Sequence, residues 1–244
     1  MKRVVLILLF VSSILSAKVV NIAVAANVSY AIEDLKKEFK KSYPDIDVRV
    51  TLGSSGKLTA QIFNKAPYDI FLSANMKYPE ALHVKGFSVK EPVVYAKGAL
   101  ALLSFKARDF TKGLSLLNDK DIRRIAVANP KTAPYGKAAL EVLKNSGFLK
   151  KTLPKLVYAE SVSGVVLYVL KAADLGFVAK SSLYCKKLQK FKEGVNWTEV
   201  DSSLYTPIKQ GMVLLKNSKE AKAFYEFILG KKAKVIFEKY GYKF

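Results

Sequence analysis

Residues 47–74 read DVRVTLGSSGKLTAQIFNKAPYDIFLSA, and this stretch changes its hydrophobic period twice. Residues 47–52 alternate between apolar and polar in the manner of a β-strand, and 68–74 form a second short, strand-like run. Between them, apolar side chains recur at helical spacing, which predicts a short helix over 56–66. A strand, a helix and a second strand in this order predict a βαβ unit, in which the two strands lie parallel in one sheet.

The same alternation extends in both directions along the chain. Upstream, the pattern predicts a strand over 18–26 and a helix over 29–43. Downstream, it predicts strands and helices in turn at 122–128, 136–147, 155–160, 163–174 and 175–179, and then two helices at 218–230 and 231–241. This order predicts an α/β fold with mainly parallel sheets flanked by helices.

Two extended stretches interrupt the alternation, namely 93–105 with Gly98 near its middle and 206–217 with Gly211. A chain that leaves one lobe, builds a second and returns forms two lobes with a cleft between them, and such clefts are favoured ligand sites. We therefore expect 18–97 and 208–244 to form lobe 1 and 98–207 to form lobe 2, with hinges near 95–98 and 206–211.

The first seventeen residues, MKRVVLILLFVSSILSA, have the features of a secretory signal peptide. Two basic residues precede an apolar run that is too short to cross a bilayer comfortably. Small residues at Ser16 and Ala17 predict cleavage near Ala17 and export to the periplasm. The single cysteine, Cys185, then leaves an exported chain without an internal disulfide, and we interpret it as a small, partly buried apolar residue.

The formal net charge is +21, which raises the possibility of a nucleic-acid partner. The lysines are, however, spread through every predicted helix and turn, with no motif of stacking aromatic residues among them, and export also argues against nucleic acid. We interpret the charge as a solvated basic surface that attracts small anions through its long-range field.

Four loops leave a predicted strand and enter a predicted helix. Each contains Asn, Ser, Thr or Gly, the residues that cap helices or allow close approach to the backbone. They are 25–29, 53–57, 132–136 and 160–164, two in each expected lobe. Ligands of open α/β sheets bind at the carboxyl ends of the strands, and converging helix N-termini would bind an anion.

Other interpretations of GSSGK (53–57) are weaker. A serine nucleophile needs a base, and the one histidine, His83, lies in what resembles a surface helix end. A Ser–Lys pair with Lys57 is conceivable, although a lysine in the first turn of a helix normally points to solvent. The spacing does not match a phosphate-binding P-loop, and one His with one Cys supports no metal site. A plain helix cap remains the simplest alternative for this loop alone.

Together, these loops and the segments around them resemble the periplasmic molybdate-binding proteins of ABC transporters. Residues 53–82 are similar to the signature of that family, and 127–143, 158–169, 175–181 and 223–242 follow in the same order. The resemblance implies a two-lobed type II periplasmic binding protein without enzymatic activity. It implies molybdate or tungstate as the ligand, no cofactor, a membrane permease with its ATP-binding subunit as partner, and we expect a monomer.

Carried over by motif, the resemblance implies four residues that contact the oxygens of the anion, not the metal atom itself. They are Asn27, Ser55, Tyr135 and Val162, the last two through backbone N–H groups. Ala179 stands where some members have a tyrosine donor, so either one fewer hydrogen bond is made or the side-chain amide of Asn27 compensates. Ser54 is interpreted mainly as a turn and cap residue.

The expected ligand chemistry favours neutral donors. Molybdate carries no proton at neutral pH and accepts hydrogen bonds only, whereas phosphate keeps a proton and gains from a carboxylate acceptor. Glu160 is the only acidic residue near the four loop residues, and we expect it to face away from the ligand. The alternatives are a receptor for sulfate, phosphate or an organic anion with the same fold, and, less favoured, a secreted Ser–Lys hydrolase.

Overall fold

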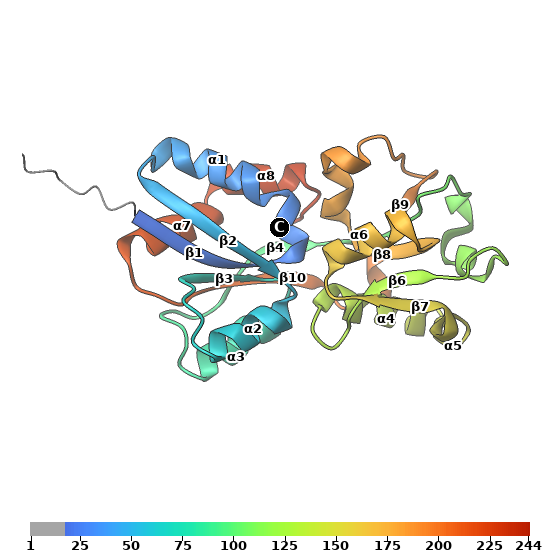
Figure 1. The fold of residues 1–244 in the computed structure, drawn as a ribbon, viewed down its shortest axis with the longest axis horizontal. Helices are drawn as coiled ribbons and strands as arrows, with labels where there is room; N and C mark the ends of the chain where they lie inside the picture. Colours follow the sequence, from blue (N-terminus) through green and yellow to red (C-terminus); the bar gives the residue numbers. More distant parts are fainter. Residues whose placement is uncertain (1–17) are drawn as a thin grey trace, which may run out of the picture.

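The computed structural model describes residues 18–244, so the predicted signal peptide lies outside the described residues. Two five-stranded sheets, each flanked by helices, form two lobes that lie side by side (Figure 1). The strand order is β2-β1-β3-β10-β4 in the first sheet and β7-β6-β8-β5-β9 in the second. The chain therefore has the two-lobed α/β architecture that its sequence predicts.

Lobe 1 is built from both ends of the described chain. Its strands are β1 (Lys18–Ala25), β2 (Ile46–Gly53), β3 (Ile70–Ser73), β4 (Val93–Gly98) and β10 (Ile208–Leu214). Its helices are the 3-10 turn η1 (Ala26–Tyr30), α1 (Ile32–Ser42), α2 (Ser55–Phe63), α3 (Lys77–Val84), α7 (Lys219–Leu229) and α8 (Lys231–Lys239).

Lobe 2 is built from the middle of the chain. Its strands are β5 (Leu100–Leu103), β6 (Ile125–Ala128), β7 (Leu156–Ala159), β8 (Leu175–Ala179) and β9 (Trp197–Glu199). Its helices are α4 (Pro134–Asn145), α5 (Leu149–Thr152) and α6 (Val162–Lys171), with 3-10 segments that include η2 (Phe110–Asn118) and η4 (Lys180–Tyr184).

The two sheets share one pattern of strand directions. In each, three adjacent strands are parallel, namely β2, β1 and β3 in the first and β7, β6 and β8 in the second. One strand, β10 or β5, pairs antiparallel with both of its neighbours. Four of the five strands in each sheet therefore point the same way, and the opposed strand is the one that follows a crossing between the lobes.

The apolar pattern of β1 explains how the first sheet is covered on both faces. Val20, Ile22 and Val24 pack into the core formed with α1, α7 and α8. Ala23, which points the other way, packs with residues of α2 and α3. This alternation is the period-two geometry of a strand, and a sheet covered on both faces leaves its strand ends free to carry a site.

Predicted element boundaries differ from the structure mainly at the strand-to-helix loops. Residues 26–30 form the short η1 turn, so α1 begins at Ile32 instead of residue 29. The helix predicted from 136 begins at Pro134, because proline has the backbone angle of a first helical turn and needs no N–H there. The run predicted as one extended stretch over 93–105 is divided between β4 and β5, which lie in different sheets.

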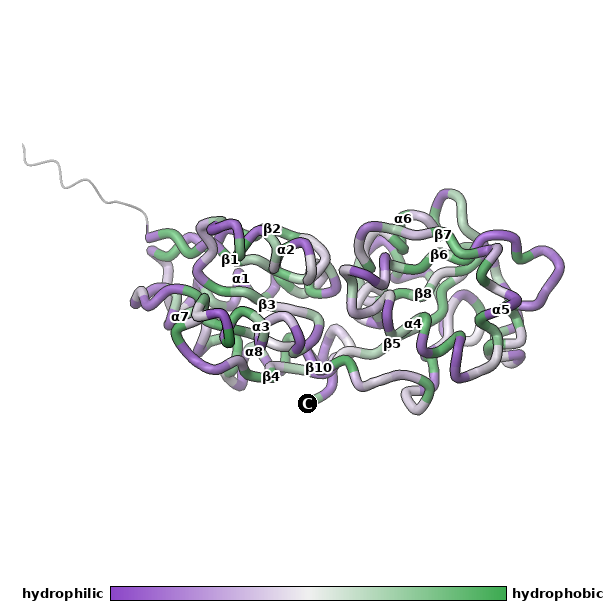
Figure 2. The backbone as a smooth tube through the Cα atoms, turned by 90° about the horizontal axis from the view of Figure 1, so that it is seen from below, coloured by the Kyte–Doolittle hydropathy of each residue, from purple (hydrophilic) through white to green (hydrophobic). Residues whose placement is uncertain are grey.

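The chain crosses between the lobes twice, once between Gly98 and Leu100 and once between Glu199 and Ile208. In the view from below, the chain crosses near β10 and β5 between the two bodies (Figure 2). Gly98 permits the first crossing, because a side chain at this position would collide with the hydroxyl of Tyr135. The hinge positions given above stay predictions.

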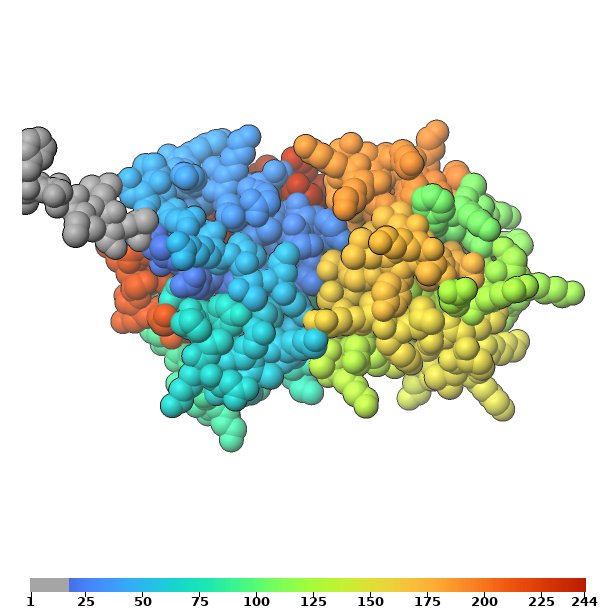
Figure 3. Space-filling view, in the orientation of Figure 1, coloured from blue at the N-terminus to red at the C-terminus, as the bar shows by residue number. Residues whose placement is uncertain are grey.

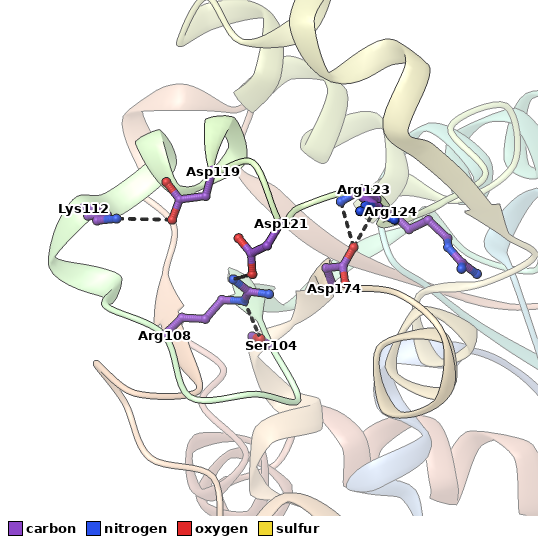
Figure 4. Close-up of polar contacts among 8 residues, drawn as sticks. All are labelled: Ser104, Arg108, Lys112, Asp119, Asp121, Arg123, Arg124 and Asp174. Carbon is purple, nitrogen blue, oxygen red and sulfur yellow. Dashed lines mark hydrogen bonds and ion pairs between the residues drawn. The ribbon is translucent and has the colours of Figure 1, made fainter.

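Charged side chains of lobe 2 bind one another at some distance from the junction (Figure 4). Asp174 Oδ2 accepts hydrogen bonds from the main-chain nitrogens of Arg123 and Arg124 at 2.8 and 2.9 Å. Arg108 Nη1 lies 2.7 Å from Asp121 Oδ2. These contacts tie together the loops of lobe 2 that lead into β6. None of the helices in the described part of the chain is long and apolar enough to span a membrane.

Candidate anion-binding site

The four predicted loops meet at the junction of the lobes. Ala25 at the end of β1 pairs with Gly53 at the end of β2, so the turns that follow start side by side. β6 and β7 are paired in the same way up to Ala128 and Ala159 in lobe 2. A single cavity between these ends is lined by Ala25, Ala26, Asn27, Gly53, Ser54, Ser55, Ala74, Ala133, Pro134, Tyr135 and Val162. The structure therefore brings together Asn27, Ser55, Tyr135 and Val162, and adds Ser54.

The cavity is small and its lining is uncharged. Its volume is about 10 Å³, roughly the space of one water molecule. Among the described residues that line it, none carries a carboxylate, an ammonium or a guanidinium group. The opening helical turns η1, α2, α4 and α6 all reach this cavity with their first residues. Such turns present N–H groups without intrahelical partners and the positive ends of helix dipoles, so the cavity is suited to a small anion.

Asn27 is completely buried, and the protein uses both hydrogens of its side-chain amide nitrogen. Its Nδ2 donates to Gln210 Oε1 and to Tyr242 Oη, both at 2.8 Å. Gln210 Nε2 donates to the main-chain oxygen of Ile208 at 3.0 Å, which leaves its Oε1 as the acceptor and fixes the orientation of the Asn27 amide. Of the two alternatives given for Ala179, this arrangement favours one fewer hydrogen bond over compensation by the Asn27 amide, since both amide hydrogens are donated to the protein. The main-chain N–H in the η1 turn is the group that Asn27 can offer to a ligand.

Ser55 is poised to donate its hydroxyl proton. Its Oγ accepts a hydrogen bond from the main-chain nitrogen of Ala74 at 2.9 Å. That bond uses one lone pair and leaves the proton free, and the side chain is only 1% exposed. Ser55 is also the first residue of α2, so its own N–H has no intrahelical partner. Hydroxyl and N–H together give Ser55 two donors at the cavity.

Ser54 occupies the N-cap position of α2, as expected of a cap residue, and its main-chain oxygen accepts from the nitrogen of Leu58 at 3.1 Å. Its side chain, however, makes no capping hydrogen bond. Ala179, by contrast, does not line the cavity; it is buried at the end of β8, where its carbonyl accepts from Ser182 Oγ at 2.7 Å.

Tyr135 lies in the first turn of α4 with its side chain buried at the junction. It is 2% exposed, and its hydroxyl approaches the crossing strand at Gly98. Burial, together with the neighbouring hydroxyls of Tyr242 and Tyr95, raises the pKa of Tyr135 well above its ordinary value. Tyr135 is therefore a neutral hydroxyl, and its side chain anchors the loop whose N–H groups face the cavity.

Direct contacts hold the two lobes together around the cavity. The nitrogen of Gly56 donates to the main-chain oxygen of Thr132 at 2.9 Å, and Lys57 Nζ lies 2.8 Å from Glu160 Oε1. Ser181 Oγ of lobe 2 donates to the main-chain oxygen of Asn27 at 2.8 Å. In the space-filling view the lobes touch along their boundary on the visible face (Figure 3). The structure is thus a closed form, and Glu160 contacts Lys57 without lining the cavity, as expected.

Sequence reasoning missed three residues that shape the site, namely Ser181, Gln210 and Tyr242. Tyr242 lies within the 223–242 segment that carries the resemblance, but nothing local indicates that it reaches Asn27. Only the tertiary fold brings these side chains to η1, so no pattern in the sequence could have identified them.

The alternative chemistries find no support in the geometry. His83 lies in the last turn of α3, where its Nδ1 is 2.8 Å from Ser88 Oγ, and it does not line the cavity. Lys57, the other conceivable base, is held by Glu160 across the junction. In the described part of the chain, no group of three or more His, Cys, Asp or Glu residues could hold a metal ion. Cys185 is a free, half-buried cysteine, as predicted.

Comparison with known proteins places the chain in a family. Residues 20–243 match the family model described as bacterial extracellular solute-binding protein. The chain is 36% identical over 228 residues to the molybdate-binding protein ModA of Azotobacter vinelandii, spanning 91% of this chain and 89% of the relative. It is 37% identical over 226 residues to the molybdate-binding protein ModA of Rhodobacter capsulatus, spanning 90% and 86%.

The fold comparison agrees with the sequence comparison. The solved structure of the periplasmic molybdate-binding protein of Azotobacter vinelandii superposes with a TM-score of 0.85 at 34% identity, covering 92% of this chain and 99% of that one. These relatives are binding proteins, which confirms the prediction of a binding protein in place of an enzyme. The protein belongs to the family of bacterial extracellular solute-binding proteins.

Proposed function

We propose that the protein is a periplasmic receptor for molybdate, and for the nearly isosteric tungstate, that delivers the ion to the permease of an ABC transporter. The observation that carries this proposal is the uncharged cavity onto which four helical N-termini from both lobes converge. The names of the relatives point to the same ligand.

The donors assigned to the ion are main-chain N–H groups and one hydroxyl. Asn27, Tyr135 and Val162 contribute backbone N–H groups, and Ser55 contributes both its N–H and its Oγ. All contacts are made to the oxygens of the anion, and no protein atom coordinates the metal. Hydrogen bonds to a charged partner contribute about 1.5–3 kcal/mol each. Five such bonds, reduced by desolvation and lobe closure, are enough for micromolar to nanomolar affinity.

The donor chemistry also supports selection among anions. A fully deprotonated dianion accepts hydrogen bonds only, so a lining without carboxylates suits molybdate better than phosphate, which keeps a proton near neutrality. Sulfate has the same charge as molybdate and is smaller, so donors fixed on helix starts would discriminate by distance.

Closure of the lobes links binding to delivery. The contacts between Gly56 and Thr132 and between Lys57 and Glu160 span the lobes and form only in the closed arrangement. A closed receptor presents a continuous surface from both lobes to a membrane permease, whereas an open one does not. We propose that the permease and its ATP-binding subunit recognise this form of a monomeric receptor.

A thermal-shift screen against oxyanions tests the proposal, because a ligand that binds only the folded protein raises its melting temperature by mass action. Molybdate and tungstate should raise it at micromolar concentrations, and sulfate, phosphate and acetate should not. The Ser55→Ala variant should show a smaller shift, while Ser115→Ala, an exposed serine of η2, should behave as wild type. A shift with sulfate or phosphate equal to that with molybdate would contradict the proposed ligand.

A further inference from the structure

Ser54 Oγ is a buried hydroxyl without a hydrogen-bond partner among residues 18–244. The residue is 3% exposed and lines the cavity beside Ser55. Buried polar atoms in folded proteins are nearly always paired, and leaving one unpaired costs folding free energy. The described residues therefore provide no hydrogen-bond partner that would offset the cost of burying this hydroxyl.

Ser54 is the N-cap residue of α2, a position at which a serine hydroxyl normally has a hydrogen-bond partner. A serine at this position ordinarily accepts a hydrogen bond from an N–H in the first turn of its helix. Ser218 at the start of α7 does so, with its Oγ 3.1 Å from the nitrogen of Ala221. Ser54 has the same extended backbone conformation as Ser218, yet its hydroxyl accepts no hydrogen bond from the first turn of α2.

Two consequences follow for the cavity. The N–H of Gly56 is used by Thr132, but no side-chain cap covers the N–H of Ser55, so that group stays available to a ligand. The hydroxyl itself also stays available, next to that N–H group and at the same lining. A hydroxyl can donate to an anion, whereas the unpaired Oδ1 of Asn27 can only accept.

We infer that Ser54 contacts the bound oxyanion through its Oγ–H and is a ligand-binding residue in addition to Ser55. The inference rests on the proposed function and assigns one more donor to the same site. Its physical basis is that the ion takes the place of the missing capping bond, because it accepts from both the N-cap hydroxyl and the N–H of Ser55 in the first turn.

A pair of matched N-cap variants, Ser54→Ala and Ser218→Ala, tests this inference with two measurements on each protein. Calorimetric titration with molybdate gives the affinity, and thermal unfolding without the ion gives the stability. We expect Ser54→Ala to weaken molybdate binding about tenfold, since it loses a hydrogen bond to a charged group. Its ion-free melting temperature should be unchanged or higher, because an unpaired buried hydroxyl has been removed. Ser218→Ala should show the reverse, with a lower melting temperature and wild-type affinity.

The outcomes separate the inference from the proposed function. Wild-type affinity in Ser54→Ala, with or without a loss of ion-free stability, would overturn the assignment of Ser54 and leave the receptor function intact. Failure of the wild-type protein to bind molybdate would overturn both. The Ser54→Gly variant guards against a folding defect, because glycine is a good N-cap residue and also lacks the hydroxyl. It should lose affinity to the same extent as Ser54→Ala.

Discussion

Tyr242 Oη lies 2.8 Å from Asn27 Nδ2 and 3.0 Å from the main-chain oxygen of Asn27, although 215 positions separate the two residues in the chain. Tyr242 is held in turn by its neighbour Lys243, which exchanges two main-chain hydrogen bonds with Lys97 of β4 at 2.6 and 2.9 Å. One buried hydroxyl thus ties the η1 turn of the cavity to the strand that leads into the crossing between the lobes.

Replacement of Tyr242 by phenylalanine should therefore weaken both folding and ion binding. The change removes two buried hydrogen bonds and leaves Asn27 Nδ2 with one acceptor, which should lower the free energy of unfolding by about 1–3 kcal/mol. The loosened η1 turn should also weaken molybdate binding by about 1 kcal/mol, or about fivefold. Calorimetry and chemical unfolding measure the two effects. The control is Tyr240→Phe, whose hydroxyl donates to Asp34 Oδ2 outside the cavity, and it should leave affinity unchanged. Equal affinity in Tyr242→Phe and wild type would contradict this role.

Gly56 should be required for lobe closure and dispensable for folding. A Cβ at this position would lie 2.8 Å from Tyr78 Oη and 3.0 Å from both Cα and O of Thr132, and Thr132 belongs to the other lobe. Alanine favours a helix by about 1 kcal/mol over glycine, so Gly56→Ala should keep or raise the ion-free melting temperature. Its molybdate affinity should fall by at least about tenfold, because the closed form becomes strained.

The matched control for Gly56→Ala is Gly164→Ala in the first turn of α6. The nearest atoms to a Cβ there are Ala159 Cβ at 3.3 Å and Ser161 Oγ at 3.7 Å, both in its own lobe. Small-angle scattering with and without molybdate reports closure directly. If the Gly56→Ala variant became as compact as wild type on addition of the ion, close approach of residue 56 to Thr132 would not be needed for lobe closure.

The ion pair between Lys57 and Glu160 should slow the release of the bound ion, but it should contribute little to the affinity of the protein for that ion. Both side chains are about half exposed, at 52% and 63%, so the pair contributes only about 0.2–1 kcal/mol. Lys57→Met and Glu160→Gln should each raise the dissociation rate by about two- to fivefold, and the double variant should add nothing further. Stopped-flow measurements at low and high salt test this, with Lys112→Met, which breaks a pair remote from the junction, as control. Additive effects of the two changes would indicate that the pair does not act as a unit.

Ion affinity should be independent of pH between about 6 and 9. Among residues 18–244, Tyr135 is the only titratable side chain that lines the cavity, and burial raises its pKa above the ordinary value of about 10. A raised pKa means that the neutral hydroxyl is favoured in the folded state. The stability that it contributes is therefore fully present below about pH 10 and is lost as the pH rises toward the folded pKa. Buried Tyr95 and Tyr242 have raised pKa values for the same reason and add to this alkaline loss.

Calorimetric titrations at several pH values and unfolding curves up to pH 11 check both statements. The Tyr95→Phe variant should lose less stability between pH 9 and 11 than the wild-type protein does. A change in molybdate affinity of tenfold or more between pH 6 and 9 would instead reveal a titrating group at the site.

The sequence alone was sufficient to predict the fold class and the four loops, because both depend on local patterns. Alternating apolar periods mark β1, β2, β6 and β7, and every strand-to-helix loop at their carboxyl ends carries cap-forming residues. Parallel strands place those ends together, so the convergence of Asn27, Ser55, Tyr135 and Val162 follows from the topology.

Strand directions and side-chain hydrogen bonds at the site depend on the tertiary structure and could not be predicted from local patterns. The opposed direction of β10 and β5 follows from the crossings between lobes, which periodicity does not report. The use of the Asn27 amide by Gln210 and Tyr242 depends on the tertiary position of both partners. Ser54 fits the composition of a helix cap, and only the structure shows that its hydroxyl makes no capping bond.

Calorimetric titration of residues 18–244 with molybdate, followed by the same titration with sulfate, is the most direct test of the proposed ligand. We expect one molybdate ion per chain with a dissociation constant in the micromolar range or below, and binding of sulfate at least about a hundredfold weaker, a difference of about 2.7 kcal/mol. Absence of molybdate binding, or equal affinity for the two ions, would contradict it.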